Sequence, residues 1–153
     1  EEAIKKIYDI KNRKQNKPLI ILIHDAKLLS NYVHSVPKIA YDIIEKSTQP
    51  TTIIYDKPIG LPELLIHQNT IAIRVIKNHN IKLLLKHFNK AITSTSANIS
   101  TLNNPVSFSD IDGYIKNNVD YIVPENVIKS EKINKSSTII KINRDSSITT
   151  IRH

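Results

Sequence analysis

The chain has 153 residues, 40% of them hydrophobic, and 22 basic against 14 acidic residues leave a formal charge of +8 at pH 7. It contains no cysteine, which excludes a disulfide framework, a thiolate nucleophile and a cysteine-built zinc site. The length fits one compact domain, and the charge favours an anionic partner as strongly as it favours a solvated lysine-rich surface. Every apolar run is too short to span a bilayer, so we expect a cytoplasmic protein with no membrane partner.

The first half of the chain alternates helical and strand patterns. Ile4, Ile7 and Tyr8 recur at helical spacing, and the helix they predict runs into a basic turn at residues 11–14. The next apolar run, at residues 19–23, predicts a strand that is buried on both faces. In chain order there follow a predicted helix at 26–33, a helix at 37–45 with Pro37 in its first turn, a strand at 51–55, a short helix at 61–66 and a strand at 70–76.

The second half continues this alternation and ends in a hairpin. Small polar residues at 95–98 are typical of a loop or a helix start, and Ser109 or Asp110 is expected to cap a helix that reaches Asn117. The other predicted elements are a helix at 81–88, a strand at 91–94, a strand at 121–123, and a hairpin of strands at 138–142 and 148–151. Alternating helices and strands favour an α/β domain with a mixed, largely buried sheet.

Three basic residues near the first helix are candidates for an anion site. Gly60 and Gly113 are the only glycines, so a Walker loop and a dinucleotide fingerprint are both excluded and a phosphate would need other donors. Lys11, Arg13 and Lys17 are spaced so that they could direct several donors at one polyphosphate. Cations at the end of a helix also complement the helix dipole, and this structural explanation stays open.

Further candidates lie on the later strands and loops. The small side chains of residues 93–98 leave backbone amides accessible to an anion, or else form a polar turn that caps a helix. Arg74 stands inside an apolar strand, which predicts either a ligand-facing guanidinium or a structural pairing. Ser137 and Arg152, each taken alone, are only weak indications of a binding site. The six histidines show no metal-ligand spacing, so we assign no metal ligand, and no nucleophilic triad or acid/base pair is recognisable.

Together these motifs resemble the YrdC/Sua5/YciO family in order and spacing over nearly the whole chain. The segments that carry the resemblance are Lys11-x-Arg13, Lys17-Pro18-Leu19, Ala72-Ile73-Arg74-Val75, Ser94-Thr95-Ser96-Ala97-Asn98 and Ser137-Thr138-Ile139-Ile140. The joint presence of Lys-x-Arg and Ser-x-Asn is the family's signature. The resemblance implies an α/β fold with a twisted mixed sheet and flanking helices, the YrdC/RibB-like open fold, in one domain over residues 1–153.

The resemblance also implies an activity, that of an L-threonylcarbamoyladenylate synthase, which is a nucleotidyltransferase. Such an enzyme forms threonylcarbamoyl-AMP and pyrophosphate from L-threonine, bicarbonate or CO₂ and ATP, with Mg²⁺, for the threonylcarbamoyladenosine modification of tRNA. It needs positioning and charge stabilisation rather than a protein nucleophile. Besides the substrates, tRNA or the threonylcarbamoyl-transferase proteins would be its partners.

The resemblance assigns a role to each candidate residue. ATP binding would fall to Lys11, Arg13, Lys17, Thr70, Ser96, Asn98 and Arg152, and threonine binding to Arg74, Ser94 and Ser137. Lys11 and Arg13 would be the catalytic cations, as exposed charges that face the polyphosphate. Arg74 would pair with the threonine carboxylate.

Several segments depart from the family pattern, mainly on the threonine side. The N-terminal strand with Pro-Thr-Asp-Thr-x-Tyr-Gly has no counterpart, so we expect the chain to be N-terminally incomplete. The Trp-Pro-Gly-Pro-x-Thr segment is replaced by residues 47–52, and Leu22 stands where many members carry His. Two alternatives therefore stay open: a non-catalytic YrdC-like module that binds tRNA or double-stranded RNA through its backbone, and a silent YciO-like paralogue.

Overall fold

The computed structural model describes residues 1–124, 136–143 and 145–152. The contacts divide the chain into two compact units. One unit comprises Glu1–Lys17 and Thr95–Lys135, and the other comprises Pro18–Ser94 and Ser136–His153. We call them the loop unit and the sheet unit. The single YrdC-like domain over residues 1–153 stays a prediction.

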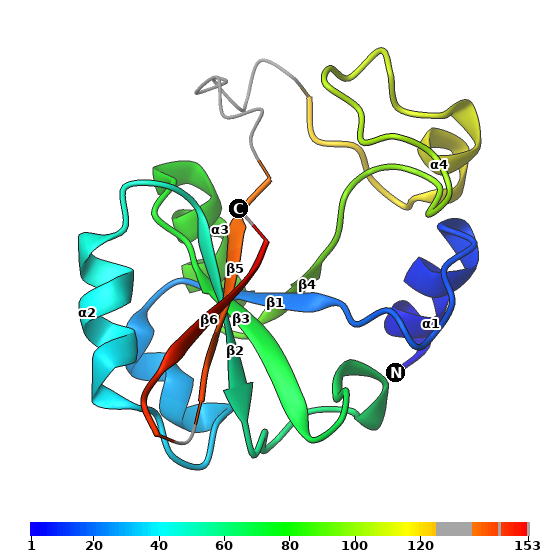
Figure 1. The fold of residues 1–153 in the computed structure, drawn as a ribbon. Coiled ribbons are helices and arrows are strands. Elements are labelled where there is room, and N and C mark those ends of the chain that lie inside the picture. The colour runs from blue at the N-terminus through cyan, green and yellow to red at the C-terminus, as the bar shows by residue number, and fades with distance from the viewer. Residues whose placement is uncertain (125–135, 144, 153) are drawn as a thin grey trace. The chain divides into compact units, whose positions relative to one another are not determined.

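The sheet unit is built on a six-stranded mixed sheet in the order β4-β1-β3-β2-β5-β6 (Figure 1). The strands are β1 (Ile20–Ile23), β2 (Thr51–Asp56), β3 (Thr70–Val75), β4 (Ile92–Ser94), β5 (Thr138–Ile142) and β6 (Ile148–Arg152). β1 is parallel to β3 and β2 is parallel to β5, whereas the other neighbouring pairs are antiparallel. The predicted α/β fold with a mixed sheet is therefore confirmed, including the C-terminal hairpin.

The two faces of this sheet differ because successive side chains of a strand point to opposite faces. One face is apolar and forms the core, with Ile21, Ile23, Ile53, Tyr55, Ile71, Ile73, Ile140 and Ile142 all buried. On the opposite face Ile20 and Leu22 are only half-buried, and Leu22 pairs with Arg74 of β3. The prediction that residues 19–23 are buried on both faces is therefore wrong, because the second face of the sheet is polar.

Two α-helices accompany the sheet, α2 (Lys38–Lys46) and α3 (His79–Phe88). Pro37 is the N-cap of α2 and stands just before its first turn. The predicted helices at 26–33 and 61–66 are shorter 3-10 helices, at Ala26–Asn31 and Glu63–Leu65. Each of these two 3-10 helices buries one side chain, Leu29 or Leu65.

The loop unit contains α1 (Glu2–Ile10) and α4 (Gly113–Asn118), which are in contact. Ile4 and Tyr8 of α1 are buried, as their spacing predicts. Lys6 Nζ of α1 and Asp120 Oδ1, which follows the end of α4, form an ion pair of 2.6 Å. Across the described residues, no helix is long and apolar enough to cross a membrane.

Two predictions for the loop unit are wrong. Asp112, rather than Ser109 or Asp110, caps α4 by accepting a hydrogen bond from the Tyr114 backbone. The Asp110 carboxylate instead accepts hydrogen bonds from two backbone amides that precede it in the chain, so it stabilises a turn before the helix. Residues 121–123 form no strand and are exposed. Their β-favouring side chains become a strand only beside a pairing strand, and none pairs with them in the described part of the chain.

Candidate functional site

Lys11 connects the end of α1 to the loop at residues 95–102 within the loop unit. It ends α1, and its Nζ donates hydrogen bonds to the carbonyl oxygens of Ser96, at 2.5 Å, and Asn98, at 2.6 Å. The residue is only 4% exposed. Burial, with a smaller contribution from the Arg13 charge, lowers the pKa of Lys11 to about 8. The prediction that Lys11 is exposed is therefore wrong, because the residue is buried and its ammonium is bound to the loop, whereas its role toward a polyphosphate stays a prediction.

The loop that Lys11 holds, residues 95–102, carries further internal hydrogen bonds. Ser96 Oγ donates to Asn98 Oδ1 at 2.5 Å, and Asn98 Nδ2 donates to the Leu102 carbonyl at 2.6 Å. The Ser100 backbone amide donates a hydrogen bond to the Lys11 carbonyl at 2.9 Å. The two halves of the predicted signature, Lys-x-Arg and Ser-x-Asn, are thus in direct contact although about 85 residues separate them in sequence.

The turn after α1 positions the other two predicted cations. Asn12 directly follows the C-cap of α1 and adopts a left-handed conformation, with φ of 46°. Arg13 is half-buried and its Nε donates to the Lys17 carbonyl at 3.1 Å, while the Lys17 side chain is exposed. The structure therefore brings Lys11, Arg13 and Lys17 together around one turn, but with different exposure to solvent.

A second cluster lies on the polar face of the sheet unit and is centred on Arg74. Its Nε donates to Thr52 Oγ1 at 3.0 Å, and its Nη2 donates to Ser137 Oγ at 2.6 Å. The two hydroxyls are also hydrogen-bonded to each other at 3.0 Å. Thr52 is 0% and Ser137 is 3% exposed. The guanidinium is thus fixed by two buried hydroxyl groups.

A second guanidinium reaches the same serine from the last strand. Arg152 donates from Nη2 to the Ser137 carbonyl at 3.0 Å and from Nε at 3.2 Å, and its Nη2 is 3.4 Å from Ser137 Oγ. Burial lowers the pKa of Arg74, and the charge of Arg152 lowers it further. Within the described ranges no carboxylate forms an ion pair with either arginine. Two neighbouring cations without a counter-ion favour the binding of an anion.

The strand registers show that four predicted residues share one face of the sheet. Ile20 pairs with both Ala72 and Ser94, Ile54 pairs with Ala72, and Ile139 pairs with both Thr52 and Arg152. Because residues two apart in a strand point the same way, the polar face carries Thr70, Arg74, Ser94 and Arg152.

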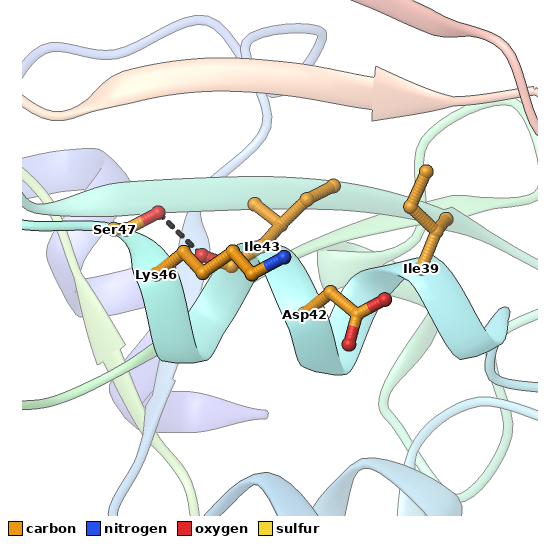
Figure 2. A pocket seen from close by; sticks show the side chains of 5 residues that line it. All are labelled: Ile39, Asp42, Ile43, Lys46 and Ser47. Carbon is orange, nitrogen blue, oxygen red and sulfur yellow. Dashed lines mark hydrogen bonds between the residues drawn. The ribbon is translucent and has the colours of Figure 1, made fainter.

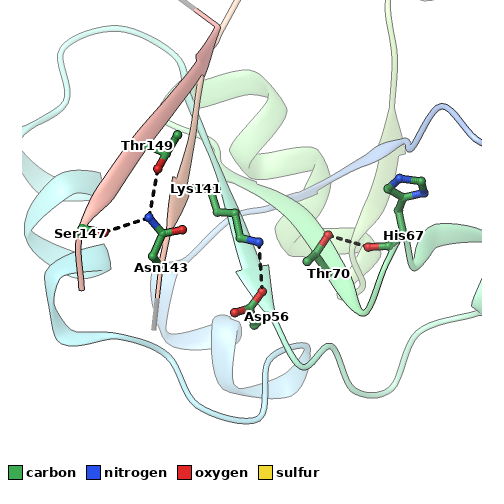
Figure 3. Close-up of polar contacts among 7 residues, drawn as sticks. All are labelled: Asp56, His67, Thr70, Lys141, Asn143, Ser147 and Thr149. Atoms are coloured by element: carbon green, nitrogen blue, oxygen red, sulfur yellow. Dashed lines mark hydrogen bonds and ion pairs between the residues drawn. The ribbon is translucent and has the colours of Figure 1, made fainter. Parts of the chain in front are cut away.

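Thr70 lies further along this polar face and has a structural hydrogen bond. Its Oγ1 donates to the His67 carbonyl at 2.7 Å (Figure 3). Nearby on the same face Lys141 Nζ lies 3.6 Å from Asp56 Oδ1 (Figure 3). Thr70 and Arg152 therefore belong to the sheet unit, whereas the other five residues predicted to bind ATP belong to the loop unit.

Thr52 is the residue of the arginine cluster that sequence reasoning did not select. A threonine in a β-favouring segment suggests only a strand. The one available signal was its place in residues 47–52, where it matches the threonine of the family's Trp-Pro-Gly-Pro-x-Thr segment. Its contacts depend on Arg74 and Ser137, which are 22 and 85 residues away.

A hollow of about 430 Å³ lies beside α2, and no predicted site residue lines it (Figure 2). It is lined by Ile39, Asp42, Ile43, Lys46 and Ser47. Ser47 Oγ donates to the Ile43 carbonyl at 2.6 Å, which closes the end of the helix. This hollow therefore adds nothing to the anion clusters.

A family model for Sua5, YciO and YrdC proteins, described as telomere recombination, matches residues 1–153. A Methanocaldococcus jannaschii relative with the provisional name threonylcarbamoyl-AMP synthase is 37% identical over 146 residues, which are 95% of this chain and 67% of the relative. The threonylcarbamoyl-AMP synthase of Pseudoalteromonas translucida is 31% identical over 130 residues, which are 82% of this chain and 69% of that protein.

A solved structure shares the arrangement of strands and helices. P. abyssi Sua5 complexed with L-threonine superposes with a TM-score of 0.72 at 25% sequence identity, covering 92% of this chain and 41% of the Sua5 chain. The present chain therefore spans about two thirds of the length of these curated relatives and less than half of the Sua5 chain.

Proposed function

Because the chain belongs to the Sua5/YciO/YrdC family, we propose that it is an L-threonylcarbamoyladenylate synthase that serves tRNA modification. The observation that carries this proposal is the cluster of Arg74, Ser137 and Arg152, which has cationic donors and no carboxylate partner among the described residues. The relatives named as synthases and the threonine bound to Sua5 support L-threonine as the anion that it binds.

In the proposed reaction the threonine amine attacks the carbon of CO₂ or bicarbonate and forms a carbamate, with loss of a proton and, from bicarbonate, of hydroxide. A carbamate oxygen then attacks the α-phosphate of ATP. The bond between the α-phosphorus and the bridging oxygen breaks, and pyrophosphate leaves with the electron pair. No atom changes oxidation state, so the protein has to supply only orientation and positive charge.

Arg74 would hold the threonine carboxylate. Two of its five N–H groups are committed to Thr52 and Ser137, and the remaining ones suit a paired interaction with a carboxylate. Because the two hydroxyls fix the guanidinium before any ligand binds, little side-chain entropy is lost on binding. Ser137 would add a hydroxyl to the same carboxylate, and Ser94 lies on the same face of the sheet.

In the loop unit the roles differ from the predicted ones, since Lys11 is bound to the loop. We assign phosphate contact to Arg13 and to the exposed Lys17. Lys11 would act through Ser96 and Asn98, whose carbonyls it holds. Ser96 is exposed and remains a candidate for contact with the nucleotide.

Magnesium would enter with ATP. Over the ranges that the structure describes, no three His, Asp or Glu side chains gather in a way that could hold a metal. A magnesium ion would therefore be bound mainly by phosphate oxygens and water, and no step assigned to this chain depends on it.

Pyrophosphate release, measured with threonine and bicarbonate each present or omitted, tests the proposal. We expect release that requires both. Arg74→Ala should raise the threonine concentration for half-maximal release at least about tenfold, because a charge-assisted hydrogen bond contributes about 1.5 to 3 kcal/mol. The ATP concentration for half-maximal release should change little. Arg74→Lys, which keeps the charge but cannot reproduce the planar fork, should show an intermediate effect.

Other outcomes would favour the alternatives. Release that does not depend on threonine, or an ATP requirement that rises while the threonine requirement is unaltered, would contradict the role of Arg74. Binding of tRNA or double-stranded RNA without any pyrophosphate release would indicate the RNA-binding module. ATP binding without turnover would indicate a silent paralogue.

A further inference from the structure

Thr52 links the two main groups of the arginine cluster through a single buried hydroxyl. Thr52 Oγ1 accepts a hydrogen bond from Arg74 Nε at 3.0 Å and lies 3.0 Å from Ser137 Oγ. The residue is 0% exposed, so water cannot replace either contact. A hydroxyl has one O–H donor and two acceptor lone pairs. The direction of each proton in this cluster can therefore be worked out.

Arg74 is a pure donor, so Thr52 Oγ1 accepts from it and retains its own O–H. The only hydrogen-bond partner of that O–H among the described residues is Ser137 Oγ. An unused O–H on a fully buried side chain is costly, so Thr52 donates to Ser137. Ser137 Oγ also accepts from Arg74 Nη2 at 2.6 Å. These two donors occupy both lone pairs of Ser137 Oγ, and the longer hydrogen bond from Arg152 Nη2, at 3.4 Å, shares one of them.

This arrangement leaves the Ser137 O–H without an acceptor among the residues that the structure describes. Its oxygen is polarised by donors from Arg74 and Thr52, and Arg152 Nη2 is 3.4 Å away. Successive hydrogen bonds of this kind strengthen one another. This O–H, together with the Arg74 N–H groups that have no acceptor in the described part of the chain, would be satisfied by a ligand that only accepts hydrogen bonds. Such a ligand is an oxyanion, for example a carboxylate.

We propose that Thr52 is a positioning residue, whose hydroxyl fixes the Arg74 guanidinium and turns the Ser137 O–H toward a bound carboxylate. This inference rests on the proposed function for the identity of the ligand, L-threonine. The cluster itself rests only on contacts within the sheet unit. Thr52 acts through Arg74 and Ser137 and has no direct contact with the ligand.

Three variants separate this role from general packing. Thr52→Val removes the hydroxyl and keeps the shape, whereas Thr52→Ser keeps the hydroxyl and removes a methyl group. Thr51→Val is the matched control, because Thr51 precedes Thr52 on the same strand and points to the opposite face. Its hydroxyl donates to the Gln49 carbonyl and, within the described residues, takes no part in the arginine cluster. Circular dichroism would verify that each variant is folded.

The first readout needs no substrate. In ¹⁵N-labelled protein the Nε–H signal of Arg74, identified by its loss in Arg74→Lys, should exchange slowly with water because a buried hydroxyl accepts it. We expect slow exchange in the parent, in Thr52→Ser and in Thr51→Val, and fast exchange in Thr52→Val. Slow exchange retained in Thr52→Val would overturn the proposal. If Thr52→Val does not fold, fast exchange in folded Thr52→Ser would overturn it as well.

The second readout is the L-threonine concentration for half-maximal pyrophosphate release. Thr52→Val should raise it about tenfold, which corresponds to about 1.4 kcal/mol, with little change in the ATP concentration, and Thr52→Ser should restore it. Equal effects of valine and serine, or equal shifts for threonine and ATP, would show that Thr52 only packs. If the parent neither binds nor uses L-threonine, the proposed function fails, while the exchange experiment still decides whether Thr52 holds Arg74.

Discussion

Replacing the buried Lys11 by methionine should change how stability depends on pH. Folding takes the Lys11 ammonium out of water and lowers its pKa from 10.5 to about 8. Between these two values the unfolded chain binds more protons than the folded one, so the free energy of unfolding of the parent rises with pH. Lys11→Met has no group to titrate at this position, and the contribution is absent.

The size of the effect follows from the two pKa values. Below about pH 7 the contribution of Lys11 to the free energy of unfolding is nearly constant, because Lys11 is then almost fully protonated in both the folded and the unfolded state. Between about pH 7 and about pH 9.5 the parent should gain about 2 kcal/mol relative to Lys11→Met. At neutral pH the free energies of unfolding of the two proteins should differ by less than this amount. The hydrogen bonds of Lys11 to the Ser96 and Asn98 carbonyls, each contributing about 1.5 to 3 kcal/mol, offset the cost of burying its charge.

Urea unfolding of both proteins at several pH values provides the measurement. Lys14→Met is the matched control, because Lys14 belongs to the same basic turn and its side chain is exposed, so its curve should run parallel to that of the parent. Parallel curves for the parent and Lys11→Met would refute the burial of a charged Lys11. A parent that loses stability relative to Lys11→Met as the pH rises would refute the sign of the argument.

Two further predictions concern the loop unit. Arg13→Ala should weaken ATP binding by about tenfold or more in calorimetry, the loss of one charge-assisted hydrogen bond, whereas Lys14→Ala should not; equal affinities of all three proteins would remove Arg13 from the nucleotide site. Asp112→Ala should lower the free energy of unfolding by about 1 kcal/mol, because it removes the N-cap of α4. An Asp112 variant as stable as the parent in thermal unfolding would show that the cap contributes nothing.

Local patterns were sufficient for most of the fold. The helical spacing of Ile4 and Tyr8 corresponds to α1. The apolar runs at residues 51–55 and 70–76 correspond to β2 and β3, and each predicted strand end lies within one residue of the observed end. These signals are local, because the periodicity of a helix or a strand depends on residues that are close together in the sequence. Residues 121–123 are an exception. Their side chains favour a strand, but a strand also requires a neighbouring strand with which to pair, and no local pattern shows whether one is present.

The candidate site was predicted residue by residue, but its geometry was not. The motifs pointed to Lys11, Asn98, Arg74 and Ser137, and the structure brings them together in two pairs that are 87 and 63 residues apart in sequence. Composition and spacing indicate that a lysine is present, but they do not show whether it is exposed. An exposed Lys11 was therefore the natural expectation, and it was wrong.

The sequence by itself determined most of the helices and strands and the family that the chain resembles. The tertiary structure decided that Lys11 is buried against the loop at residues 95–102, and that Thr52 lies between Arg74 and Ser137. The physical reason is that periodicity depends on residues a few positions apart, whereas burial and hydrogen-bond partners depend on segments that only folding brings together. A buried lysine and a fully buried threonine hydroxyl look, in sequence, like any other lysine and threonine.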